Sequence, residues 1–112
     1  MMKLALSRAA TALIRALVER TGLDKNRIVL IECRSVDWQS LTFIGERHEL
    51  SLRLPPPDAE EALMALTGGL EDAEFDLPGH VVVDIALMQS PVAERDGSVI
   101  VDLEALTIRD AD

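Results

Sequence analysis

Three consecutive prolines, Pro55 to Pro57, divide this chain into two runs of secondary structure. A proline ring fixes φ and removes the backbone N–H, and it also holds the preceding residue in an extended conformation. Neither a helix nor a central strand can therefore pass through this segment. We expect the prolines to join two halves, residues 1–54 and 58–112, within a single domain spanning the 112 residues of the chain.

The first half has the pattern of a helix followed by two strands. Apolar residues recur at helical spacing from about Lys3 to Thr21, and Gly22 is suited to the left-handed conformation that ends a helix. Two β-rich segments follow at 28–36 and 41–54, and a turn at 37–40 is predicted to join them. The apolar residues of the second segment change from odd to even positions, which predicts a β-bulge near Gly45 and Glu46.

The second half has the same order of elements. Asp58 and Glu61 have the spacing of a capping box, which predicts a helix that begins there and ends at Gly68. Strands are predicted at 81–88 and 98–108.

Two local signals belong to this last hairpin. The dipeptide Asp96-Gly97 is typical of a reverse turn, because glycine adopts positive φ readily. A change of apolar phase near Ala105 predicts a second bulge.

These elements predict an α+β fold. The order is αββαββ, and the apolar faces can be buried together in a two-layer sandwich, in which a four-stranded antiparallel sheet carries both helices on one face.

Charge is distributed unevenly between the halves. Residues 1–57 contain nine Lys and Arg and six Asp and Glu, whereas residues 58–112 contain two and fourteen. A net charge of −9 disfavours nucleic acid and anionic membranes as partners. The acidic stretch 58–76 is either a solubilising surface or a docking surface for a basic partner or for the arginine-bearing helix of a second copy. The residues predicted to form such an interface are Trp38, Arg8, Arg15, Glu71, Asp72 and Glu74.

The chain contains one cysteine, Cys33, so an internal disulfide is impossible and a reducing compartment, the cytoplasm, is expected. Arginines interrupt the Ala- and Leu-rich N-terminal segment too often for a secretory signal or a membrane span. An Arg- and Ala-rich segment also resembles an organelle transit peptide, but an ordinary amphipathic helix is the interpretation we favour.

Glu46 and His48 share one face of a predicted strand, which suits an acid–base pair or two metal ligands, with His80 or Asp84 as a third group. The alternative is cross-strand ion pairing on an exposed face. Cys33 is a candidate nucleophile if His48 lies opposite it, and a small buried apolar residue otherwise. With two histidines in the chain, and without a phosphate-binding or dinucleotide motif, we expect no metal and no cofactor.

These observations favour a protein-interaction or assembly module, expected to form a homodimer or to bind a protein partner. A second hypothesis is a domain that binds an apolar small molecule in a pocket between Leu63, Leu66 and the sheet. A third is a small enzyme that uses Glu46 and His48.

Overall fold

The computed structural model describes residues 6–110. It is an α+β structure in which helix α1 (Arg8–Thr21) precedes strands β1 (Val29–Gln39) and β2 (Ile44–Leu54), and helix α2 (Ala59–Thr67) precedes β3 (His80–Leu87), β4 (Val92–Ala93) and β5 (Val99–Arg109). Two short 3-10 helices, η1 (Lys25–Arg27) and η2 (Leu70–Asp72), follow α1 and α2 respectively. The sheet order is β1-β2-β5-β3, with β4 paired to β5, and the pairings between these strands are antiparallel.

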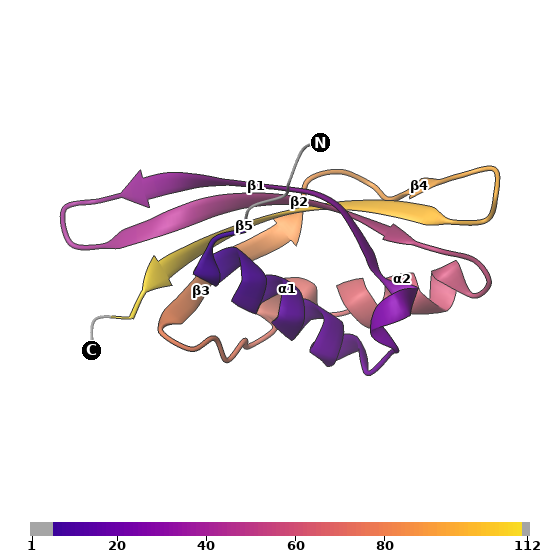
Figure 1. The fold of residues 1–112 in the computed structure, drawn as a ribbon, viewed down its shortest axis with the longest axis horizontal. Helices are drawn as coiled ribbons and strands as arrows, with labels where there is room; N and C mark the ends of the chain where they lie inside the picture. The colour runs from indigo at the N-terminus through magenta and orange to yellow at the C-terminus, as the bar shows by residue number, and fades with distance from the viewer. Residues whose placement is uncertain (1–5, 111–112) are drawn as a thin grey trace.

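Both helices lie on the same side of the sheet, which leaves the other face without a helix in the described part of the chain (Figure 1). The core lies between these layers and consists of small and aliphatic side chains. Leu13 and Leu17 of α1 and Leu66 of α2 are buried against Leu50, Leu52, Leu54, Val101 and Leu103 of the sheet. The sheet contains five strands and not the four expected, because the segment after β3 returns to β5 as the two-residue β4.

The strands on either side of the prolines belong to one sheet, because β2 pairs with β5 from Gly45 to Leu54. The prolines end β2 at Leu54 and precede α2, as expected from their geometry. The two predicted halves therefore share a core.

The ends of α1 show how local sequence sets a helix boundary. Helix α1 begins at Arg8, because the Ser7 side chain accepts a hydrogen bond from the N–H of Ala10 and caps the first turn. The predicted start near Lys3 lies outside the described residues. Gly22 adopts φ 69° and its N–H donates to the Glu19 carbonyl oxygen, as predicted.

The predicted capping box at α2 is wrong. Asp58 has φ 64°, and its side chain makes no capping hydrogen bond, although Ala62 N–H donates to the Asp58 carbonyl oxygen. A capping residue normally has an extended backbone, so the left-handed conformation removes the geometry that the side chain needs. The other end of α2 is held from α1, where the Arg20 guanidinium donates to the carbonyl oxygens of Ala65, Leu66 and Gly68.

The bulges predicted near Gly45 and near Ala105 are wrong, and the bulges in the sheet lie on other strands. β2 and β5 pair without a register shift from Gly45 to Leu54, whereas shifts occur in β1 between Leu30 and Glu32 and in β3 between Val82 and Asp84. A bulge in a central strand disturbs two ladders, but one in an outer strand disturbs only one. The phase change in 41–54 arises instead because Leu41 and Phe43 lie in the turn before β2 and are exposed.

The first hairpin turns later than predicted. β1 extends to Gln39, and the turn is closed by the Ser40 N–H donating to the Phe43 carbonyl oxygen. Trp38 is consequently a strand residue opposite Gly45 and does not lie at the hairpin tip.

The second hairpin contains the reverse turn that Asp96-Gly97 predicts. Gly97 has φ 92°, and its N–H donates to the Glu94 carbonyl oxygen. Asp96 Oδ1 accepts hydrogen bonds from both the N–H and the hydroxyl of Ser98, and Oδ2 forms an ion pair with Arg53 at 2.6 Å.

Candidate functional site

The face of the sheet opposite the helices is the largest feature whose role the core does not explain. We call it the open face. Side chains of directly paired residues point to the same side of a sheet, so the register assigns each residue to a face. The apolar members of the open face, counting the bulged Ile31 and Val83, are Val29, Ile31, Val36, Trp38, Val81, Val83, Val92, Ile100, Leu106 and Ile108.

Several of these apolar side chains are exposed to a degree unusual for valine in a sheet. Val36 is 56 % exposed and Val83 is 54 % exposed, whereas Leu106 between them is 9 % exposed. At one end of the sheet Trp38, Gly45, Ile108 and Val81 form one row across four strands. In this row Val81 is exposed, Trp38 and Ile108 are half-buried and Gly45 is buried. Exposed apolar side chains bordered by charge, such as Val36, Val81 and Val83, are typical of interaction surfaces.

Gly45 allows strands β2 and β5 to approach each other closely in this row. A Cβ atom built on Gly45 would lie 2.0 Å from the Thr107 carbonyl oxygen and 2.9 Å from the Ile108 Cα atom, so β5 approaches β2 more closely here than a side chain permits. The half-buried Trp38 lies directly opposite Gly45 in the ladder. A large aromatic residue beside a strand glycine covers backbone that would otherwise be exposed.

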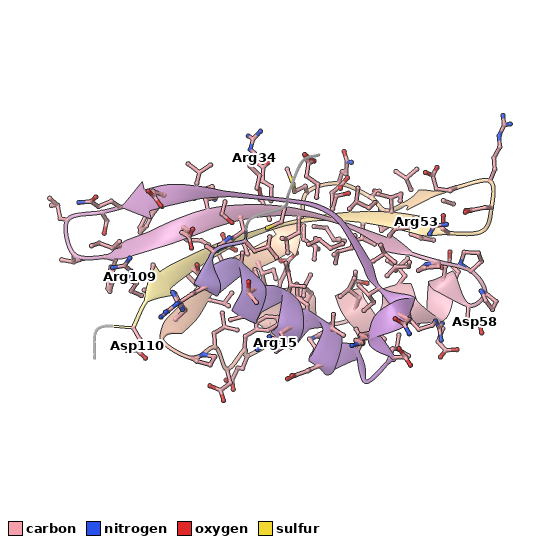
Figure 2. All side chains as sticks on the ribbon, viewed as in Figure 1. Arg15, Arg34, Arg53, Asp58, Arg109 and Asp110 are labelled. Carbon is pink, nitrogen blue, oxygen red and sulfur yellow. The ribbon has the colours of Figure 1, made fainter. Side chains whose placement is uncertain are left out.

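The charges of the open face are separated across the strands. Its arginines, Arg34, Arg47 and Arg53, lie on β1 and β2, and Arg34 points away from the helix layer (Figure 2). The strands β3 and β5 contribute the carboxylates of Asp84, Asp102 and Glu104. Glu32 and Glu49 reduce, but do not reverse, the positive charge of the β1–β2 side.

The other predicted interface residues lie on the helix side of the molecule. Arg8 and Arg15 are exposed on α1, and Arg15 lies beside the helix in Figure 2. Glu71 and Asp72 are exposed in η2, and Glu74 is exposed in the loop that follows. The fold thus separates Trp38 from these charged residues.

His48 lies on the helix-covered face and is fully buried. Its Nδ1 atom is 2.7 Å from Ser35 Oγ, and its Nε2 atom is 2.8 Å from Thr107 Oγ1. A neutral imidazole has one N–H donor and one acceptor nitrogen, and each hydroxyl can either donate or accept, so both ring nitrogens are satisfied in either tautomer. The three side chains join β1, β2 and β5 through a buried polar bridge.

Burial lowers the pKa of His48, while the nearby Glu46 carboxylate opposes the shift and His80 adds to it. The imidazole is therefore held in its neutral form. A neutral histidine bonded to a serine hydroxyl has the geometry of a base and a nucleophile, but an oxyanion-binding group is also needed for acyl transfer. The enzyme hypothesis stays a prediction on these residues.

Cys33 is not the residue opposite His48. The register pairs Cys33 with Leu50 and Ser35 with His48, and the Cys33 sulfur lies 3.9 Å from Ser35 Oγ. Burial raises the pKa of the Cys33 thiol, with Ser35 opposing the shift and Glu46 adding to it. These surroundings disfavour the thiolate that a nucleophile needs.

The candidate third groups lie on different faces. His80 is on the helix-covered face, where it pairs with Arg109, whereas Asp84 pairs with Leu106 on the open face. Within residues 6–110, His, Cys, Asp and Glu side chains do not gather in groups of three or more that suit a metal ion.

Leu63 and Leu66, predicted to line an apolar ligand pocket, take part in core packing. Leu66 is fully buried and Leu63 packs against the same cluster. These two side chains pack α2 against the sheet, and this packing does not favour a ligand site at this position.

Sequence reasoning missed Ser35, Thr107 and the apolar residues Leu106 and Ile108. The two-residue period could have placed Ser35 and His48 on one face, but only the strand pairing shows that they are opposite each other. Thr107 is 59 residues from His48 and meets it only because β2 pairs with β5.

In the described part of the chain, no helix combines the length and apolar character required to cross a membrane. Comparison of the chain with models of known protein families and with curated protein sequences gave no match.

Proposed function

We propose that this protein is an assembly module that pairs with a second copy of itself through the open face of its sheet. The observation that carries the proposal is the exposure of apolar side chains on that face, led by Val36 and Val83. An antiparallel sheet can leave one face to water, but that face is then mainly polar. Covering these side chains would remove apolar surface from water and favour association.

Pairing through the sheet edges is a weaker alternative. The outer strands β1 and β3 each contain a bulge, at Ile31 and Val83. Bulges on outer strands interrupt the row of hydrogen-bonding groups that another strand would need. The face is therefore the better surface for a partner.

The size of the open face suits a dimer. Four strands about 4.8 Å apart, each of up to about eleven residues rising about 3.3 Å per residue, give a face of about 700 Å². A standard interface buries about 800 Å² on each partner.

Charge favours a second copy as the occupant. A two-fold axis parallel to the strands, between β2 and β5, would place the β1–β2 side of one copy over the β5–β3 side of the other. The three arginines Arg34, Arg47 and Arg53 would then lie over Ala86, Leu106 and Ile100, each one open-face position from a carboxylate of Asp84, Glu104 or Asp102. One like-charged pair, Glu49 over Glu104, would oppose these contacts. In the same arrangement, Trp38 would face Val81, and Gly45 would face Ile108.

A cytoplasmic location is part of this proposal. A chain with one thiol gains nothing from an oxidising compartment, and its acidic surface disfavours nucleic acid as a competing partner.

Sedimentation velocity over a range of protein concentrations tests the proposal. The wild-type chain is expected to form a dimer, and Val36→Asp is expected to sediment as a folded monomer. Met64→Asp is the matched control, because Met64 is 73 % exposed on α2 and undergoes the same chemical change on the other side of the molecule. A monomeric wild type, or a Val36→Asp variant that dimerises as well as Met64→Asp, would contradict the proposal.

A further inference from the structure

A second surface lies on the helix side of the sheet and is independent of the open face. The β1–β2 hairpin extends beyond the first turn of α1 (Figure 1), and a hollow of about 540 Å³ lies between that end of the sheet and the start of the helix. Most of the residues that line it are small or polar, so it is not an extension of the core.

The floor of the hollow contains Thr107, which is 1 % exposed and whose hydroxyl contacts His48. A threonine hydroxyl has one donor and two acceptor positions, so one bond to the imidazole leaves capacity for another. The buried bridge of Ser35, His48 and Thr107 thus holds a hydroxyl in a defined place beneath the hollow.

The charges around this floor are separated by strand. Asp37 of β1 and Glu46 of β2 lie in the same row as Thr107, whereas Arg109, further along β5, pairs with His80 of β3. Arg8 of α1 also lines the hollow. Asp110 lines the rim on the basic side and is the exception to this separation.

These opposite charges are close but do not neutralise each other. Within residues 6–110 the groups that line the hollow make no ion pair with one another, and the Arg53–Asp96 pair lies at the other end of the sheet (Figure 2). Glu46 and Arg109 are on adjacent strands, one diagonal position apart, a separation of about 7–8 Å between Cα atoms. A molecule with both charges would satisfy both sides.

We propose that this hollow binds a small zwitterion of the amino-acid class. Its ammonium group lies toward Asp37 and Glu46, and its carboxylate lies toward the Arg109 guanidinium, above the floor that contains Thr107. A guanidinium offers the planar pair of donors that a carboxylate accepts, and hydrogen bonds between charged groups are among the stronger ones.

His80 also lines the hollow. Its Nδ1 atom lies 3.1 Å from the Pro78 carbonyl oxygen, which can only accept, so Nδ1 carries a proton and Nε2 is the ring atom available to the ligand.

The test is a titration of the full-length ¹⁵N-labelled protein, followed by amide chemical shifts. The probes are glycine, β-alanine and 4-aminobutyrate, which have increasing separation of charge, with acetate and ethylamine as half-ligands. At least one zwitterion is expected to shift the amides around Glu46, His80 and Thr107 and to bind at least about tenfold more tightly than either half-ligand.

Glu46→Gln and Arg109→Gln are each expected to weaken binding of that zwitterion by about tenfold. Glu71→Gln and Arg95→Gln are the matched controls, because they make the same changes in residues that do not line this hollow. The proposal is overturned if none of the three zwitterions shifts these amides, if a half-ligand binds as tightly as the zwitterions, or if the variants and controls bind alike. These outcomes do not depend on dimerisation, since the hollow and the open face lie on opposite sides of the sheet.

Discussion

His48 Nε2 and Thr107 Oγ1 lie 2.8 Å apart in the interior, although 59 residues separate them in the chain. The contact joins the two central strands, and Ser35 extends it to β1. Because both ring nitrogens are bonded to neutral hydroxyls, the bridge is stable with a neutral imidazole, and protonation would place a charge in a buried site.

The first prediction concerns pH. The pKa of His48 is lowered from 6.5 in the folded protein, so as pH falls below that value the unfolded chain binds a proton that the folded protein resists. The stabilisation from neutral His48 is therefore present above pH 6.5 and is lost as pH falls toward the folded pKa. The free energy of unfolding should decrease by up to about 1.4 kcal/mol per pH unit from this group.

Urea unfolding of the wild type and of His48→Gln at a fixed protein concentration measures this effect. The variant should lack this part of the pH dependence, whereas His80→Gln, which leaves the bridge intact and removes only the smallest of the three causes of the pKa shift, should retain most of it. Identical pH profiles for the wild type and His48→Gln would show that the bridge does not control the titration.

The second prediction concerns the turn before β5. Hydrogen bonds from the Ser98 side chain and backbone, and then the contact with Arg53, lower the pKa of Asp96 from 3.8 to about 2. A lowered carboxyl pKa stabilises the fold above pH 3.8, and that stabilisation is lost as pH falls from 3.8 toward about 2. Asp96→Asn should therefore lower the Tm at neutral pH, and the difference from wild type should close in that range. Glu94→Gln in the same turn is the control; a difference in Tm that persists at the acid end would refute this account.

The third prediction concerns the contact between the helices. Arg20→Met removes the guanidinium donors to the carbonyl oxygens of Ala65, Leu66 and Gly68, and it should reduce the free energy of unfolding by about 2 kcal/mol. Arg20→Lys should recover only part of this loss, because an ammonium group lacks the planar fork of donors.

Arg15→Met on the same helix is the control for Arg20→Met. Arg15 is exposed, and its removal should change stability by less than about 0.5 kcal/mol. Chemical denaturation distinguishes the variants, and equal effects at the two positions would mean that Arg20 does not cap α2.

The fourth prediction tests the orientation of the proposed dimer. The two-fold arrangement places Arg47 of one copy over Leu106 of the other, one open-face position from Glu104. Arg47→Glu should weaken dimerisation by at least about tenfold, and adding Glu104→Arg should restore most of it.

Lys25→Glu in η1 makes the same charge change on the helix side and should leave the dimer intact. Sedimentation equilibrium gives the dissociation constants, with circular dichroism to confirm folding. If the double variant is no tighter than Arg47→Glu alone, the copies pair in another orientation.

Several elements were predictable because short segments determine them. The prolines end β2, Gly22 ends α1 in the left-handed conformation, Gly68 follows the last residue of α2, and Gly97 forms the turn before β5. The prolines act through their fixed φ and missing N–H, and Gly22 and Gly97 act through their positive φ, whereas Gly68 has an ordinary φ of −61°.

The bulges show why the alternation of apolar residues along one strand could not locate them. The sequence contains apolar phase changes, but a bulge is a property of two paired strands. Until β2 and β5 are known to be central, nothing indicates that the extra residues belong to β1 and β3. The capping box at Asp58 failed for a related reason, since the spacing was correct but the backbone conformation was not.

The amino-acid sequence by itself determined the α+β class, the antiparallel hairpins and the uneven charge, because these follow from local periodicity, turn residues and composition. The tertiary structure alone decided that His48 contacts Thr107, that Trp38 lies opposite Gly45, and that the open-face arginines and the facing carboxylates lie on opposite sides of that face. The physical reason is that strand order and register bring together residues far apart in the chain, and a shift of one residue would move each side chain to the other face.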